Sequence, residues 1–170
     1  MKYFTMEKEN MVNGPGLRTV VWVSGCEHHC PNCHNPETWD KDSELAKEWS
    51  KEAEKELFKS IKPDYISGVT FSGGDPLAPY NRVGVLRIIK KIRHKFGDKK
   101  SIWVYTGYTF EEVSGIAGLD NIDVLVDGEF KEQYKSRDIM WRGSTNQRLI
   151  DVKTSLLAGM VMELKDKDVQ

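Results

Sequence analysis

The sequence of 170 residues lacks three features, and each absence excludes a class of protein. No apolar stretch approaches the ~20 residues of a membrane-spanning helix, since the longest, residues 156–162, has the size of a core segment. The first residues contain no apolar signal core, so we expect a cytoplasmic protein without membrane attachment. A basic excess is also missing, because the formal net charge is -1, and we therefore expect no nucleic acid as a partner.

Cysteine is absent except from one short stretch. Cys26, Cys30 and Cys33 all lie within "GCEHHCPNCHN", residues 25–35. An odd number of thiols argues against a disulfide framework, which also belongs to oxidising compartments. Buried structural cysteines scatter along strands and helices, whereas C-x3-C-x2-C among glycine, proline and polar residues is typical of a metal or cluster site. The spacing therefore predicts such a site.

Two kinds of centre suit three thiolates, namely zinc and an iron–sulfur cluster. A structural zinc ion needs four ligands, and His28, His29 or His34 could supply the fourth. This keeps a zinc-stabilised, non-enzymatic binding module open as an alternative. A [4Fe–4S] cluster usually takes four cysteines, so three would leave one iron without a protein ligand. Open coordination is what separates a catalytic metal from a structural one.

Strand-like and helix-like segments alternate along the chain. Apolar β-branched runs predict strands, and apolar residues at helical spacing predict amphipathic helices. The predicted strands are 17–24, 65–71, 101–107, 121–128 and 146–152, and the predicted helices are 43–60, 82–96 and 109–118. Thr109 and Glu112 have the spacing of a capping box. We expect one α/β domain over residues 1–170, with its core at about 13–155 and a frayed tail at 163–170.

About five to six βα units are too few for a closed barrel, which needs ~250 residues. We therefore expect a partial, open βα barrel, with a doubly wound sheet as the alternative. Both architectures place functional groups at the carboxyl ends of parallel strands. The cysteine loop, "SGGDP", "YTGY" and "VDGEF" all follow predicted strands, so we expect them to face one cleft.

The cysteine loop resembles that of the radical S-adenosylmethionine (SAM) superfamily. Residues 14–35, "GPGLRTVVWVSGCEHHCPNCHN", are similar to the signature of its glycyl-radical activating enzymes. The matching positions are Gly14, Gly16, Arg18, Gly25 and Asn35, and Trp22 stands where phenylalanine is usual. The resemblance implies a [4Fe–4S] cluster on Cys26, Cys30 and Cys33, with SAM on the remaining iron. It implies no catalytic side chain beyond the cluster.

The same resemblance implies where SAM binds. Backbone groups of Asn32, Cys33 and His34 would hold the adenine, because the residue directly before the last cysteine, Asn32, is not aromatic. "FSGGDP" would hold the methionine ammonium through the backbone of Gly73 and Gly74 and the carboxylate of Asp75, where glutamate is more usual. An isolated "FSGGDP" would otherwise indicate a tight turn.

Two further residues are assigned on the resemblance. Asp127 would be an acid near SAM, although "VDG" is also an ordinary acidic turn. Arg142 in "RGSTNQ" would contact SAM or a partner protein, and a surface loop is the alternative. Trp39 and Trp141 are candidate partner anchors, but core packing is the commoner fate of tryptophan.

Among activating enzymes, the chain most resembles those that serve anaerobic ribonucleotide reductase. The chain is short, has no further cysteines, and contains "YTGYTFEEV", "DVLVDGEF" and "RGSTNQRLIDV". The resemblance implies one electron from a reduced flavodoxin-like protein, reductive cleavage of SAM, and a 5′-deoxyadenosyl radical. That radical would take a hydrogen atom from a glycine of the reductase large subunit. Activation of another enzyme, such as pyruvate formate-lyase, is the alternative.

Overall fold

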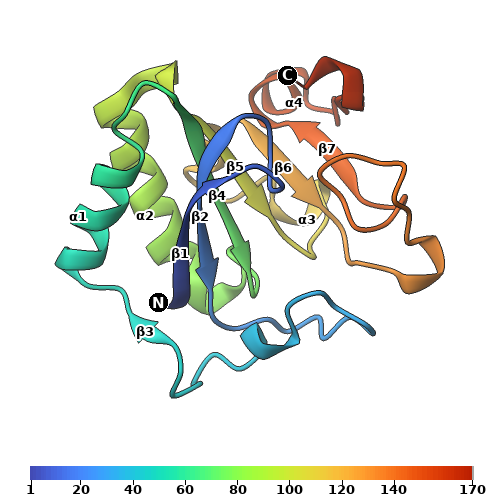
Figure 1. Cartoon of the computed structure of the whole chain (residues 1–170). Coiled ribbons are helices and arrows are strands. Elements are labelled where there is room, and N and C mark those ends of the chain that lie inside the picture. The colour runs from blue at the N-terminus through green and yellow to red at the C-terminus, as the bar shows by residue number, and fades with distance from the viewer. Residues whose placement is uncertain (170) are drawn as a thin grey trace.

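The computed structural model describes residues 1–169 and contains one seven-stranded sheet (Figure 1). The strands are β1 (Lys2–Asn10), β2 (Leu17–Val23), β3 (Lys47–Glu48), β4 (Ile66–Gly73), β5 (Ser101–Tyr105), β6 (Val124–Asp127) and β7 (Arg148–Asp151). Their order across the sheet is β3-β1-β2-β4-β5-β6-β7. The four strands β2, β4, β5 and β6 run parallel, and β1, β3 and β7 pair antiparallel. The α/β class is confirmed, and the sheet is not closed.

The helices of the described residues give fewer βα steps than the sequence predicted. They are α1 (Lys51–Ser60), α2 (Pro79–Phe96), α3 (Phe110–Val113) and α4 (Val152–Ala158). Helices α1, α2 and α3 make the three crossovers between the parallel strands, so the expectation of five to six units was wrong. Between β6 and β7, residues 128–147 contain no α-helix that would return the chain to the other end of the sheet. Strand β7 therefore pairs antiparallel with β6. None of these helices is long and apolar enough to cross a membrane.

Helix α1 begins later than its periodicity predicted. The Ser50 side chain accepts hydrogen bonds from the backbone N–H groups of Glu52 and Ala53, which makes Ser50 the N-cap. Before it, Leu45 is 79% exposed and strand β3 pairs with β1. The prediction of helix over 43–50 was wrong because a cap interrupts an otherwise continuous helical pattern. The capping box of Thr109 and Glu112 is confirmed at the start of the short α3.

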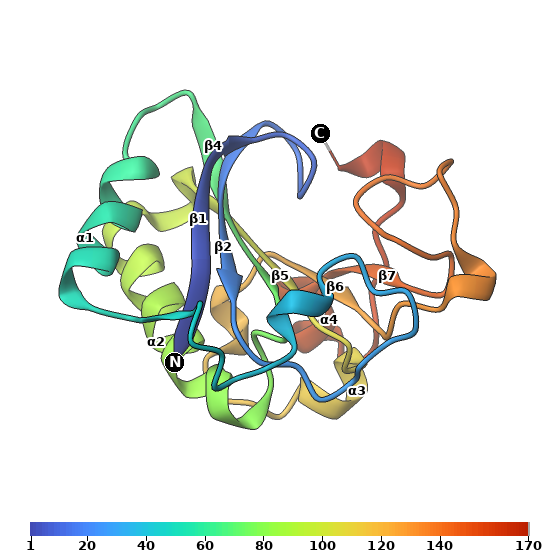
Figure 2. The same cartoon turned by 60° about the horizontal axis from the view of Figure 1, so that its bottom comes forward.

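The two faces of the sheet bury different clusters. Along β5, Ile102 and Val104 belong to the large core that includes α1 and α2, whereas Trp103 belongs to a second cluster. Figures 1 and 2 show α1 and α2 side by side, with the segment between β6 and β7 at the other end of the sheet. Leu164 packs against the second cluster, and its N–H donates to Leu149 O at 2.7 Å. The chain from Glu163 on, expected to fray, therefore lies partly against β7, and Gln170 is outside the described residues.

Arg18 is completely buried and joins the central strands. Its guanidinium donates to Thr70 Oγ1 at 2.9 Å, to Val69 O at 3.0 Å and to Ser101 O at 3.0 Å. Another bond reaches Pro15 O at 3.2 Å and holds the loop before β2. Burial lowers the pKa of Arg18 to about 10. Because Arg18 lies at the opposite end of β2 from the cysteines, it supports the sheet and does not face the cysteine loop.

Candidate functional site

All three cysteines line one cavity of about 110 Å³ at the carboxyl ends of the parallel strands. The same cavity is bounded by residues at the end of β4 and in the loops after β4, β5 and β6, namely Ser72, Gly73, Gly74, Asp75, Thr106, Gly107, Gly128 and Phe130. The structure thus brings the cysteine loop together with the "SGGDP", "YTGY" and "VDGEF" segments. Parallel strands end at the same edge of the sheet, which is why these distant segments meet.

Backbone hydrogen bonds fix the cysteine loop. Cys26 N–H donates to Trp39 O at 3.0 Å, and Cys33 N–H donates to Cys30 O at 3.1 Å. Asn35 N–H points to Cys33 Sγ at 3.4 Å. These backbone hydrogen bonds therefore contribute to the shape of the loop.

The thiols are chemically suited to a metal centre. The three cysteines are free and partly exposed. Burial raises the pKa of Cys26 to about 11, and it also raises the pKa of Cys30. These thiols keep their protons until a cation displaces them, so loading of the site releases protons.

The donor set of the cavity suits a metal centre. Three soft sulfur donors, those of Cys26, Cys30 and Cys33, line it, and all three thiols are free. Thiolates bind iron–sulfur clusters as well as zinc, so the residues present fit an iron–sulfur cluster.

His28 joins the cysteine loop to two carboxylates. Its Nε2 lies 3.0 Å from Asp75 Oδ2, and its Nδ1 lies 3.0 Å from Glu129 Oε1, with 12% of the side chain exposed. The interaction with Asp75, followed by that with Glu129, raises the pKa of His28 to about 9 against the effect of burial. As a fourth zinc ligand, His28 would have to release one of these carboxylates, because each ring nitrogen is already paired. No local pattern predicts this bridge, because its three members are far apart in the chain.

Gly73 and Gly74 allow the loop after β4 to pack against the end of β2. Gly74 N–H donates to Val23 O at 2.8 Å, and Asp75 N–H donates to Gly25 O at 2.7 Å. A Cβ on Gly74 would lie 2.3 Å from Gly25 O, and one on Gly73 would lie 2.8 Å from Val23 O. Gly73 also has a φ of 98°, which favours glycine. These glycines bring the loop to the cavity edge, and their contact with SAM stays a prediction.

The Asp75 carboxylate is buried, with 1% of the residue exposed, and is fully engaged. It accepts hydrogen bonds from Leu77 N at 2.8 Å, Thr106 Oγ1 at 2.8 Å and Gly107 N at 2.9 Å, in addition to the His28 ion pair. It therefore organises the loops around the cavity. A direct contact with SAM stays a prediction that requires one of these donors to be released.

Asp127 lines a neighbouring cavity of about 670 Å³, which shares His28, Gly107 and Gly128 with the cysteine cavity. Its carboxylate accepts from Phe110 N at 2.7 Å and from Arg148 Nε at 3.0 Å. These hydrogen bonds occupy Asp127, so its approach to SAM stays a prediction. Sequence reasoning missed Arg148, whose only signal is a cation at the start of the last strand.

The other predicted residues lie around the cavity or apart from it. Asn32 and His34 are exposed on the cysteine loop, and the His34 ring lies 5.3 Å from that of Phe130. Arg142 lines neither cavity, because its guanidinium pairs with Asp166 and, at 3.9 Å, with Glu163. Its contact with SAM or a partner stays a prediction.

The two tryptophans proposed as partner anchors lie in different surroundings. Trp141 packs against the buried Trp103 with ring centroids 6.2 Å apart, which assigns it to the core. Trp39 packs edge-on against His29 of the cysteine loop, with ring centroids 5.0 Å apart, so Trp39 lies next to the candidate site.

Comparison with known proteins gives the same kind of centre. The family described as "4Fe-4S single cluster domain" matches residues 12–150. An anaerobic ribonucleoside-triphosphate reductase-activating protein of Enterobacteria phage T4 is 37% identical over 150 residues, or 88% of this chain and 93% of that protein. Proteins of the same name from Escherichia coli (strain K12) and Vibrio cholerae serotype O1 are 38% and 39% identical over 151 residues. Each of these two alignments covers 86% of this chain and 96% of the relative.

Proposed function

The chain belongs to the anaerobic ribonucleoside-triphosphate reductase-activating proteins, and we propose that it activates an anaerobic ribonucleotide reductase as a radical SAM enzyme. Its target is a glycine in the large subunit of the reductase, which becomes a glycyl radical. The observation that carries the proposal is the shared cavity of Cys26, Cys30 and Cys33 beside Gly73 and Gly74. It lies in a chain that matches the 4Fe-4S single cluster family over most of its length.

We propose that the three cysteines hold the [4Fe–4S] cluster and leave one iron for SAM. Held by these cysteines, a reduced cluster would supply the one electron for reductive cleavage of SAM to methionine and a 5′-deoxyadenosyl radical, and this radical would take the glycine hydrogen atom. The protein's own part is to bind, to orient and to exclude water. No side-chain base is required, because a hydrogen atom and not a proton leaves the glycine.

The residues divide this work. Asn35 N–H stabilises Cys33 Sγ, and the ion pair of His28 with Asp75 holds the cysteine loop against the loop after β4. Backbone groups of Gly73 and Gly74 are proposed to take the methionine end of SAM. The adenine is proposed to rest on the backbone at 32–34, with Asp127 and Arg142 as further contacts once their present ion pairs open.

The open sheet suits a macromolecular substrate. We propose that it is a partial βα barrel, which its four central parallel strands and the functional groups at their carboxyl ends support. The cavity of about 670 Å³ next to the cysteines is the proposed entrance for the glycine-bearing loop of the reductase. A reduced flavodoxin-like protein is the proposed electron donor, and the cytoplasm, where thiols stay reduced, is the proposed location.

The test is anaerobic reconstitution with iron and sulfide, followed by incubation with SAM, dithionite and the reductase large subunit. Electron spin resonance should show a glycyl radical on the large subunit. The variant in which all three cysteines are alanine should bind no cluster and form no radical. SAM cleavage by that variant would overturn the site, and a radical formed only on pyruvate formate-lyase would overturn the partner. A colourless protein that contains zinc and no acid-labile sulfide would overturn the class.

A further inference from the structure

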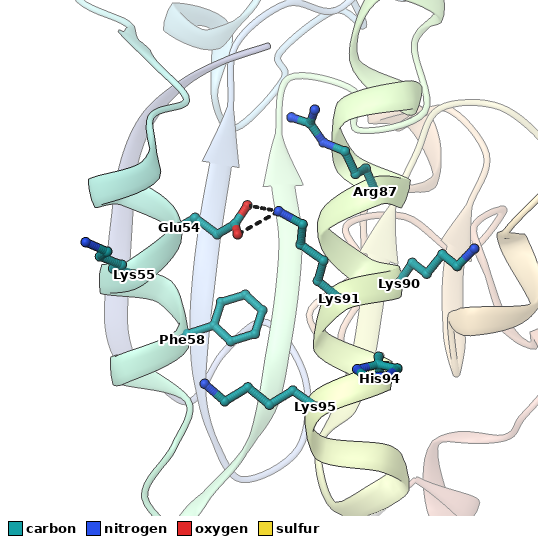
Figure 3. Close-up of a pocket in the computed structure, with 8 residues that line it drawn as sticks. All are labelled: Glu54, Lys55, Phe58, Arg87, Lys90, Lys91, His94 and Lys95. Carbon is teal, nitrogen blue, oxygen red and sulfur yellow. Dashed lines mark hydrogen bonds and ion pairs between the residues drawn. The ribbon is translucent and has the colours of Figure 1, made fainter.

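A second surface feature lies away from the cysteines, between α1 and α2. It is a groove of about 770 Å³, and none of its lining residues lines the cysteine cavity. Figure 3 shows Phe58 of α1 and Lys91 and Lys95 of α2 directed into the space between the helices. The lysine and arginine residues of the lining are Lys55, Arg87, Lys90, Lys91 and Lys95, and His94 lies beside them. The single carboxylate among the lining residues is Glu54.

Two of these cations are held in place by other groups of the groove. Lys91 Nζ bonds to both oxygens of Glu54, at 2.7 and 2.8 Å, so the carboxylate is already neutralised. Lys95 Nζ lies 5.0 Å from the centroid of the Phe58 ring and 5.6 Å from that of Phe96. The groove therefore has an aromatic floor and two cations in defined positions before any ligand binds.

The remaining cations have no ionic partner within residues 1–169. Arg87, Lys90 and Lys55 are exposed and form no salt bridge there. Cations three or four positions apart on one helix repel each other, as Arg87 and Lys91 do. An anionic partner would relieve that repulsion.

We propose that this groove docks an acidic segment of a partner protein. From Arg87 to Lys95 the cations extend over ~12 Å of helix, which matches several carboxylates along a polypeptide and exceeds a single phosphate. Both walls are the flanks of helices, whose N–H groups are used internally, so the groove offers no backbone cradle for a phosphate. Phe58 and the aliphatic parts of the lysines supply apolar contact for the partner's side chains.

The docked segment would lie on a helix that also contacts the candidate site. At the start of α2, Asn81 Nδ2 donates to Ser24 O at 2.9 Å, two residues before the first cysteine. The groove is on the outer side of the sheet, so a protein can bind there while the cysteine cavity stays open. Docking at this surface does not require the cluster.

Binding of fluorescein-labelled poly-L-glutamate to the full chain, followed by fluorescence anisotropy at low ionic strength, tests the proposal. Reversal of three exposed cations in R87E/K90E/K95E should weaken binding at least about tenfold. The matched control K47E/K165E/K167E changes the net charge equally on exposed lysines outside the groove, and it should bind like the wild type. Carbodiimide cross-links from the peptide should map to lysines of the groove.

The neutral variant R87Q/K90Q/K95Q keeps the test valid if the charge-reversed variant misfolds. Its affinity for poly-L-glutamate should lie between that of the wild type and that of R87E/K90E/K95E. Urea unfolding of all variants should show the same cooperative transition. Equal losses in the groove variant and the control would overturn the docking site, because net charge alone would then explain binding. Tighter binding of oligothymidylate or ATP than of poly-L-glutamate would also overturn it, in favour of a nucleic acid or nucleotide surface.

Discussion

His28 Nε2 lies 3.0 Å from Asp75 Oδ2, and this ion pair joins the cysteine loop to the loop after β4. The same Asp75 carboxylate accepts the Gly107 N–H at 2.9 Å, so segments from three strands meet at one buried acid. The positions of the cysteines therefore depend on groups that need not touch the cluster. Such supporting groups orient metal ligands as much as the loop backbone does.

Replacing His28 with alanine should loosen the cysteine loop without removing a thiol. We expect the reconstituted H28A protein to lose iron about 10- to 100-fold more readily to a chelator, as for other groups that orient ligands. Iron per protein after chelator challenge measures this. H94A, at an exposed histidine of α2, is the control. Wild-type iron retention in H28A would show that the backbone alone shapes the loop.

Gly74→Ala should disturb both the fold and the cluster site. The new Cβ would meet Gly25 O at 2.3 Å, and backbone on both sides leaves little room to relax. We expect a loss of about 1–3 kcal/mol in the free energy of unfolding, typical of overpacking, together with lower iron content. Urea unfolding and iron assays measure the two effects. G115A is the matched control, since a Cβ there meets nothing within 4 Å. An unchanged unfolding midpoint in G74A would contradict the packing role.

Arg18→Lys should destabilise the protein although the charge is kept. Lysine cannot reach Thr70, Val69 and Ser101 together, so buried acceptors would lose their donors. We expect a cost of about 2–4 kcal/mol in the free energy of unfolding. Exposed Arg87→Lys should change it by less than ~0.5 kcal/mol. Equal stability of R18K and R87K in urea would mean that the buried network contributes little.

The ion pair of Glu111 with Arg148 predicts a pH dependence. Arg148 Nη2 lies 2.7 Å from Glu111 Oε2, and this hydrogen bond lowers the pKa of Glu111 below its ordinary 4.5. The folded state thus holds its proton less tightly than the unfolded chain, so the pair stabilises above pH 4.5 and less as pH falls through the lowered value. Because the Glu111 side chain is 59% exposed, solvent screening keeps the effect small, below ~1 kcal/mol.

The measurement is urea unfolding of wild type and E111Q across the acid range. E111Q should be less stable at neutral pH, and the difference should vanish as Glu111 becomes protonated. A gap that stays constant down to strongly acidic pH would show that the substitution acts through packing and not through charge.

Some of this protein could be predicted from local patterns. The buried strands at Leu17–Val23 and Ile66–Gly73 are apolar runs, and α2 has apolar residues at helical spacing. The local sequence of each segment is therefore enough to predict its secondary structure. The start of α1 escaped prediction because the Ser50 cap interrupts a helical pattern that continues on both sides of it. The direction of β7 escaped for another reason, since local sequence does not encode which way a strand enters a sheet.

The spacing of Cys26, Cys30 and Cys33 along the chain is enough to predict a metal or cluster site, because it places three thiols on one loop. Tertiary structure alone decided that His28, Asp75 and Glu129 meet there, and that cations of two helices share one groove. The difference follows from separation along the chain. The residues of a loop motif are neighbours in the sequence, whereas the residues of these ion pairs and of the groove come together only when the sheet and its helices have assembled.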